Sequence, residues 1–175
     1  MKITIGGKAG SGKTTVAKLL AKRLNLKYYS IGKIQRAIAK KRGITILELS
    51  RVEEQNPEID KEIDEKQKEL AKEDNFVLDS RLGAFFIKNS IKVFLDANEF
   101  VRAKRILKDK RVAENNKNLK EVIKNMRQRE ESEKRRYKSY YNINCYNKNY
   151  YDIVIDTTNL TPEEVVTKII KKLNL

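Results

Sequence analysis

The sequence contains no histidine, and this absence removes several classes of catalytic and metal-binding site at once. General acid–base catalysis by imidazole, histidine ligands for a metal, and serine or cysteine nucleophiles activated by histidine are all excluded. Cys145 is the single cysteine, so the chain forms neither a disulfide framework nor a cysteine cluster for zinc. We expect this thiol to be buried and unreactive.

Long apolar runs are also absent, since no stretch approaches the roughly 18 residues that a membrane-spanning helix requires. Met1 leads directly into a predicted core strand, without the charged and then apolar segments of a secretory leader. These patterns predict a cytoplasmic protein with no membrane partner.

The composition is that of one highly charged domain. The chain has 175 residues, of which 39% are hydrophobic and 36% charged, and its formal net charge is +15. Such an excess attracts polyanions, among them nucleotides, RNA and acidic membranes. Because the lysines are scattered along nearly every predicted helix, a solvated surface is the better interpretation, and we do not expect a nucleic-acid partner. We also expect a monomer.

A phosphate-binding loop is the strongest motif in the chain. Residues 7–14 fit the pattern of glycine, four residues, glycine, lysine, and then serine or threonine. The loop follows a predicted strand, residues 2–6, and opens a predicted helix, residues 13–24, which is the context the motif requires. The alternative is an ordinary glycine-rich turn between a strand and a helix. The expected nucleotide-binding residues are Gly7, Lys8, Ala9, Gly10, Ser11, Gly12, Lys13, Thr14 and Thr15.

Each fixed position of the loop has a chemical role. Glycines let successive backbone N–H groups turn toward an anion, and the positive end of the following helix points at the same place. Lys13 is a mobile cation for the β- and γ-phosphates of ATP. The Thr14 hydroxyl is positioned to bind a Mg²⁺ ion that bridges these phosphates.

Strands alternate with helices along the whole chain. After the first strand we predict strands at 27–30, 76–79, 91–96 and 151–156, with helices over much of 33–72, at 99–108 and 119–141, and after Thr161. Thr161 and Glu164 form a capping box, with Pro162 at the first helical position. This order predicts a doubly wound α/β fold in three layers, with a mainly parallel five-stranded sheet.

Arginines and carboxylates follow several of these strands. Arg36 comes after the second strand, Arg81 after the third, and Arg102 lies in the helix after the fourth, where guanidinium groups could clamp phosphates. Ligands bind at the carboxyl edge of such sheets. Asp79 is therefore our candidate for a group that acts on Mg²⁺ from outside its direct ligands or through a water molecule, with Asp96 behind it, although either could instead cap a helix.

Six tyrosines lie among basic residues between positions 134 and 151. Aromatic rings interleaved with cations can stack on bases of single-stranded RNA. The favoured alternative is a docking segment whose rings pack the long helix at 119–141 against the last strand.

Together these motifs resemble the nucleoside monophosphate kinases, and most closely the archaeal type of cytidylate kinase. The resemblance rests on the phosphate-binding loop, on Gly32 with Arg36, on the strand Val-Leu-Asp-Ser-Arg81, on Val-Phe-Leu-Asp-Ala97 with Arg102, on residues 129–137, and on the closing Asp-Ile-Val-Ile-Asp-Thr-Thr158. It implies a single P-loop kinase domain, residues 1–175, of the P-loop NTPase type. Its core is implied at about 1–31, 73–108 and 142–175, a helical monophosphate-binding insertion at 32–72, and a short lid at 109–118 followed by the helix at 119–141.

The resemblance also implies roles for single residues. Lys13, Arg102, Arg129 and Arg136 are implied to be catalytic, and Arg36, Arg81, Glu133 and Arg136 to bind the acceptor. Thr14 and Asp79 are the candidates for Mg²⁺. Two positions depart from the family pattern: Ile31 replaces a serine or threonine common in related kinases, and Ser80 replaces a glycine of the bacterial enzymes.

The implied activity is transfer of phosphate from ATP to CMP and dCMP. An acceptor phosphate is already ionised at pH 7, so the missing histidine fits a reaction that needs no general base. Two alternatives stay open: a P-loop kinase for UMP, AMP or a small metabolite, and a basic RNA-binding ATPase, for which a second acidic residue after Asp79 would be typical.

Overall fold

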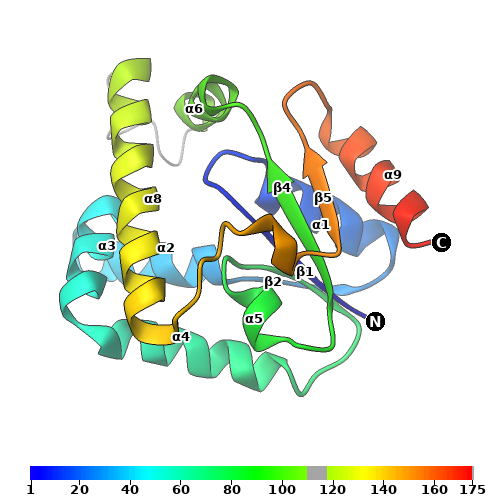
Figure 1. Ribbon diagram of the computed structural model, residues 1–175, viewed down its shortest axis with the longest axis horizontal. Helices are drawn as coiled ribbons and strands as arrows, with labels where there is room; N and C mark the ends of the chain where they lie inside the picture. The colour runs from blue at the N-terminus through cyan, green and yellow to red at the C-terminus, as the bar shows by residue number, and fades with distance from the viewer. Residues whose placement is uncertain (110–117, 175) are drawn as a thin grey trace.

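A five-stranded parallel sheet forms the centre of the molecule, as the alternating pattern predicts (Figure 1). We describe residues 1–109 and 118–174 of a computed structural model. The strand order is β2-β3-β1-β4-β5, and every pair of neighbours is parallel. The strands are β1 (Lys2–Gly7), β2 (Lys27–Ser30), β3 (Phe76–Asp79), β4 (Ile91–Asp96) and β5 (Ile153–Asp156).

Helices cover both faces of this sheet, giving the expected three layers (Figure 1). They are α1 (Lys13–Arg23), α2 (Ile31–Lys41), α3 (Ile46–Gln55), α4 (Pro57–Leu70), the short α5 (Gly83–Phe86), α6 (Glu99–Lys108), α8 (Leu119–Tyr141) and α9 (Pro162–Lys172), with a 3-10 turn at Lys148–Tyr150. The sequence pattern did not predict α5 or the 3-10 turn, because each is less than two turns long and has no periodicity to detect. The implied lid at 109–118 lies almost entirely outside the described residues.

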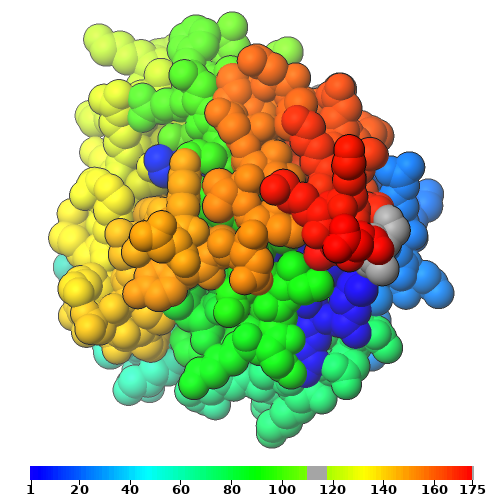
Figure 2. All heavy atoms as spheres, turned by 45° about the vertical axis from the view of Figure 1, so that its right-hand side comes forward, coloured from blue at the N-terminus to red at the C-terminus, as the bar shows by residue number. Residues whose placement is uncertain are grey.

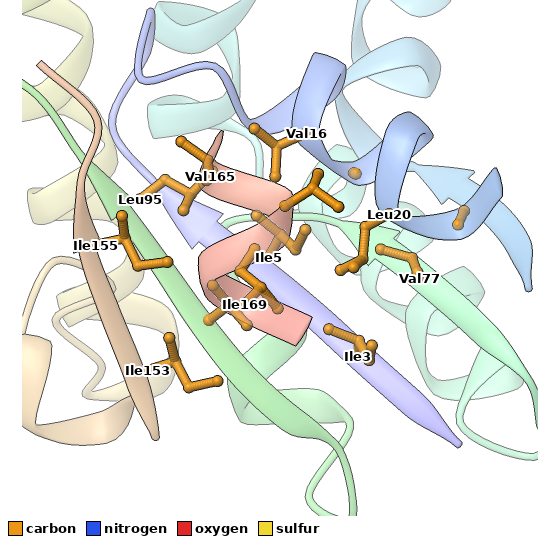
Figure 3. Close-up of a cluster of buried hydrophobic side chains, with 14 residues drawn as sticks. Ile3, Ile5, Val16, Leu20, Val77, Leu95, Ile153, Ile155, Val165 and Ile169 are labelled. Atoms are coloured by element: carbon orange, nitrogen blue, oxygen red, sulfur yellow. The ribbon is translucent and has the colours of Figure 1, made fainter. Parts of the chain in front are cut away.

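Alternating side chains of the strands point into two separate cores. Val77 packs with α1 and α9 on one face, whereas its neighbours Phe76 and Leu78 pack under α2, α3 and α4 on the other. Figure 3 shows the first core, in which isoleucines and valines from four strands meet the apolar faces of α1 and α9. Both faces of the central strands are therefore buried, as a parallel sheet requires.

Local sequence signals set several helix ends. The capping box at the start of α9 forms as predicted: the Thr161 hydroxyl accepts from the Glu164 backbone N–H, and the Glu164 carboxylate accepts from the Thr161 N–H at 2.7 Å. Thr45 and Glu48 form a second capping box at α3. The helix α2 starts at Ile31, two residues before the predicted start. Within the described residues, no helix combines the length and apolar character needed to cross a bilayer.

The segment between α8 and β5 docks through its aromatic rings, as expected. Tyr137, Tyr146 and Tyr151 pack with Phe85 and other apolar side chains under the segment. In Figure 2 this segment, in orange, lies beside the red α9 on one face of the molecule. Cys145 is buried among the same rings, and burial raises the pKa of its thiol to about 12, which agrees with the expected lack of reactivity.

Candidate functional site

The phosphate-binding loop lies between β1 and α1, at the carboxyl edge of the sheet. Gly12 precedes α1 in a left-handed conformation, with φ of 91°. Gly10 has φ of 77°, and a Cβ atom at this position would come within 2.6 Å of the Arg102 carbonyl oxygen. Glycine is favoured at both positions, since other residues are strained in this region, and at Gly10 the close approach of Arg102 leaves no room for a side chain. The loop therefore has the geometry of an anion cradle at a helix N-terminus.

Lys13 lies in this loop, where its Nζ donates to the Lys8 carbonyl oxygen at 2.7 Å. The pKa of Lys13 is lowered to about 7, first by burial and then by the nearby Arg81 guanidinium, against the opposing effect of Asp79. A phosphate group bound in the cradle would place negative charge beside Lys13 and stabilise its positively charged form.

Thr14 and Asp79, the two candidates for Mg²⁺, meet at the ends of α1 and β3. The Thr14 hydroxyl donates to Oδ2 of Asp79 at 2.6 Å, and the Ser30 hydroxyl donates to the same oxygen at 3.3 Å. Parallel pairing produces this convergence, because β1 and β2 both place residues beside Asp79. Hydroxyl and carboxylate oxygens are the donors that Mg²⁺ prefers. No cluster of three acidic or cysteine ligands occurs in the described ranges, so such an ion would also need oxygens from a ligand.

One cavity of about 460 Å³ extends from this loop in two directions. Toward α6 and α9 it is lined by Arg105, Thr157 and Leu160. Arg105 is fixed there by donating to the Thr157 carbonyl oxygen at 2.6 Å. In the other direction the lining comes from α2, α3 and α4, and from the residues after β3. The phosphate cradle is thus positioned between two compartments of the same cavity.

Arg81, Arg129 and Glu133, all candidate residues, form one buried cluster beside the loop. The Glu133 carboxylate pairs with Arg81 Nε at 2.5 Å and with Arg129 Nε at 3.0 Å, and accepts a hydrogen bond from the Tyr146 hydroxyl. Burial alone would raise the pKa of Glu133, but the two guanidinium groups hold it below its ordinary value. Both arginines line the cavity, so the cluster presents two oriented cations to a ligand.

Arg36 also lines the cavity, from α2, where its guanidinium lies over Gly32. This is the compartment in which the resemblance implies that the acceptor binds.

Arg136 lies farther along α8 and does not border the cavity. Its guanidinium is buried and pairs with Glu53 at 2.6 Å and with Asp60 at 2.8 Å, on α3 and α4. It therefore ties the long helix to the helical insertion in this conformation. Its expected contact with a phosphate stays a prediction.

Arg102 supports the phosphate-binding loop from behind. It donates to the carbonyl oxygens of Ala9 and Ala97, each at 3.1 Å, and pairs with Glu130 at 2.5 Å. Like Arg136, it is not among the residues that line the cavity, and its expected catalytic role also stays a prediction.

The sequence analysis missed three polar residues of α4 that line the acceptor compartment: Asp60, Asp64 and Gln67. Each is almost completely buried. The signal was present, because the three positions lie on one helical face, spaced by four and three residues. Ile59 and Ile63 lie on the same side of the helix and are buried, so helical spacing alone does not separate these polar positions from an apolar row.

Comparison with known proteins identifies relatives over almost the whole chain. The model of a family described as cytidylate kinase-like matches residues 2–159. A cytidylate kinase from Archaeoglobus fulgidus is 46% identical over 173 residues, which cover 98% of this chain and 93% of that protein. One from Sulfurisphaera tokodaii is 42% identical, with coverage of 98% and 93%.

Solved structures show the same fold in more distant proteins. A shikimate kinase from Bacteroides thetaiotaomicron has a TM-score of 0.67 and 19% identity, with coverage of 100% of this chain and 99% of that one. At this identity the likeness concerns the fold alone.

Proposed function

The chain belongs to the cytidylate kinase-like family, and from this premise we propose that it transfers the γ-phosphate of ATP to CMP and dCMP. The observation that carries the proposal is the position of the phosphate cradle between two compartments of one cavity. Such a cavity suits a reaction that joins two nucleotides through their phosphates. One compartment would take the adenosine of ATP and the other the acceptor.

The donor phosphates would bind in the cradle, against backbone N–H groups and Lys13. Thr14 and Asp79 offer the hydroxyl and carboxylate oxygens to hold Mg²⁺, which would neutralise phosphate charge when bound. The Arg81 and Arg129 side chains, already oriented by Glu133, would face the transferring group from the other side. The two arginines contribute fixed positive charge at the place where negative charge develops during transfer.

The chemical step needs little more than alignment. An oxygen of the acceptor monophosphate, already ionised, attacks the γ-phosphorus, and the bond from that phosphorus to the bridging oxygen of ADP breaks. No proton must be removed from the attacking oxygen, which agrees with a site that contains no histidine. Holding the two phosphates in line lowers the barrier by removing the cost of bringing them together.

The proposal is tested by measuring ADP release from Mg-ATP with CMP, dCMP, UMP, AMP and GMP, with an RNA oligomer, and with no acceptor. We expect CMP and dCMP to exceed all other acceptors. Lys13→Ala should abolish transfer while leaving the circular dichroism spectrum unchanged. If UMP, AMP or a metabolite is preferred, the chain is a kinase for that acceptor instead. If ADP is released only when RNA is present, the chain is an RNA-dependent ATPase and the kinase proposal is wrong. The monomeric state and the cytoplasmic location stay predictions, which size-exclusion chromatography and cell fractionation would test.

A further inference from the structure

Two buried polar side chains of α4, Asp64 and Gln67, line the compartment that the proposed function assigns to the acceptor. Asp64 is 3% exposed and Gln67 is 1% exposed. Burying a carboxylate and an amide is costly unless hydrogen bonds compensate each of them. The question is therefore which of their hydrogen-bonding positions the protein itself fills.

Ser80 fixes the orientation of the Gln67 amide. The Ser80 hydroxyl oxygen accepts from the backbone N–H groups of Leu82 and Gly83, at 3.2 and 3.1 Å, so its own proton is free to be donated. It donates to Oε1 of Gln67 at 2.5 Å. This identifies the amide oxygen as the atom beside Ser80, and the amide nitrogen then donates to Oδ1 of Asp64 at 2.9 Å.

Asp64 is held from its other side by the Tyr141 hydroxyl, which donates to Oδ2. Burial raises the pKa of Asp64 to about 6, with Tyr141 and Gln67 acting in the opposite direction. The carboxylate is therefore mainly ionised at pH 7.5, and accepts hydrogen bonds without donating any.

Each of the two groups retains a position for a ligand. A carboxylate oxygen can accept two hydrogen bonds, and the contacts from Gln67 and Tyr141 use one on each oxygen. The amide nitrogen of Gln67 carries two protons, and the bond to Asp64 uses one. The pair can thus offer an acceptor and a donor side by side.

We propose that Asp64 and Gln67 recognise the amino edge of the acceptor base, a step that rests on the proposed function. Asp64 accepts from the exocyclic amine of cytosine, and Gln67 donates to the adjacent ring nitrogen N3. Uracil reverses both positions: its O4 oxygen would face the carboxylate, and its N3–H would face the amide N–H. Two like groups would then oppose each other, so the pair selects by repulsion as well as attraction.

The surroundings of the pair suit a flat ring. Ile31, Ile46 and Ile63 line the same compartment, and apolar side chains of this kind can cover the faces of a base while its edge is read. Arg36 lines the same compartment as a cation for the acceptor phosphate. Adenine presents the same order of amine and ring nitrogen as cytosine, so the pair by itself does not reject AMP. Exclusion of the larger base must come from the size of the compartment.

The test compares kcat/KM for CMP, UMP and AMP in the wild-type protein and in Asp64→Asn. The substitution keeps the shape of the side chain and replaces a charged acceptor by an amide that can donate to O4 of uracil. Loss of a hydrogen bond to a charged group predicts a fall of about 10- to 100-fold in the CMP to UMP ratio. Any measurable AMP activity should fall together with CMP. Glu65→Gln is the matched control, since Glu65 lies on the same helix but is exposed and forms a surface ion pair with Lys68, and its ratio should equal that of the wild type.

Turnover of CMP by the wild-type protein tests the proposed function, and the ratio in the variant tests the pair. Suppose that the wild-type protein phosphorylates CMP and that Asp64→Asn loses CMP and UMP activity equally. Asp64 would then have a structural role, and the inference would be overturned. If Asp64→Asn does not fold, as judged by circular dichroism, Gln67→Met replaces it. This change removes the donor beside N3 without placing a second carboxylate against Asp64, so the CMP to UMP ratio should fall, and an unchanged ratio would again overturn the inference.

Discussion

The cluster around Glu133 permits a quantitative prediction for Glu133→Gln. The carboxylate is 1% exposed and compensates two guanidinium groups whose side chains are only 11% and 17% exposed. Removing one partner of a buried ion pair costs about 3–5 kcal/mol, because the remaining charge is left without compensation. Since both arginines still border a cavity that water can enter, we expect a loss near the lower end, about 3 kcal/mol.

A loss of this size is measurable in two ways. For a chain of this length it corresponds to a fall of about 6–12 °C in the thermal midpoint. Urea unfolding should report the same loss with an unchanged m-value. The matched control is Glu131→Gln, two residues earlier on α8, where an exposed carboxylate pairs with Lys134. We expect its unfolding midpoint to match that of the wild type.

The prediction also fixes a pH dependence and a ligand effect. Because the pKa of Glu133 is lowered in the folded protein, its stabilising contribution is present above the ordinary glutamate value of 4.5. It is lost as the pH falls below that value, so the difference between wild type and variant should shrink there. ATP should stabilise the variant more than the wild type, because its phosphates replace part of the missing negative charge. A loss below about 1 kcal/mol, or one equal to the control, would refute the view that Glu133 compensates buried cations.

Three further predictions concern the loop and the acceptor compartment. Gly10→Ala should abolish ATP binding in a calorimetric titration, because its Cβ would meet the Arg102 carbonyl oxygen, whereas Gly12→Ala has open space and should cost only about 1–2 kcal/mol of backbone strain. Thr14→Val should lower kcat in the ADP-release assay by more than tenfold, with stability reduced by about 1 kcal/mol, since the lost hydroxyl donates one hydrogen bond. Burial raises the pKa of Asp60 to about 7 from 3.8, so the folded protein holds a proton that the unfolded chain releases. Stability should therefore fall as pH rises from 4 to 7, and Asp60→Asn should flatten that slope in urea unfolding.

Sequence reasoning was most successful where a local pattern has one structural solution. The loop from Gly7 to Thr14 could be identified because its glycines, lysine and threonine have fixed spacing and fixed flanks. The capping box at Thr161 was equally clear, and so was the alternation of strands and helices. In each case the residues that interact are within a few positions of one another.

Contacts between distant elements could not be predicted in the same way. Nothing in the pattern around Arg136 indicates that it pairs with Glu53 and Asp60, more than seventy positions earlier. The place of Gln67 beside the cavity could not be predicted either, because helical spacing does not reveal whether a buried face meets a core or a cavity. The partners of these residues depend on how α4 and α8 pack against the sheet, which is a property of the tertiary fold.

The strand order also has a consequence for how the protein forms as it is synthesised. The first strand, β1, is the central one, and its neighbours are β3 and β4, so Lys2 pairs beside Phe76 and Ile3 beside Ile91. A ribosome adding about 5–20 residues per second must therefore reach β3 before β1 has a first partner, and must complete more than half of the chain before β1 has both. Because such distant pairings close slowly, the nascent phosphate-binding loop would remain unable to hold a nucleotide until β4 has emerged. In ribosome-bound chains stalled at increasing lengths, nucleotide binding should therefore appear abruptly once β4 has emerged, instead of increasing gradually with chain length.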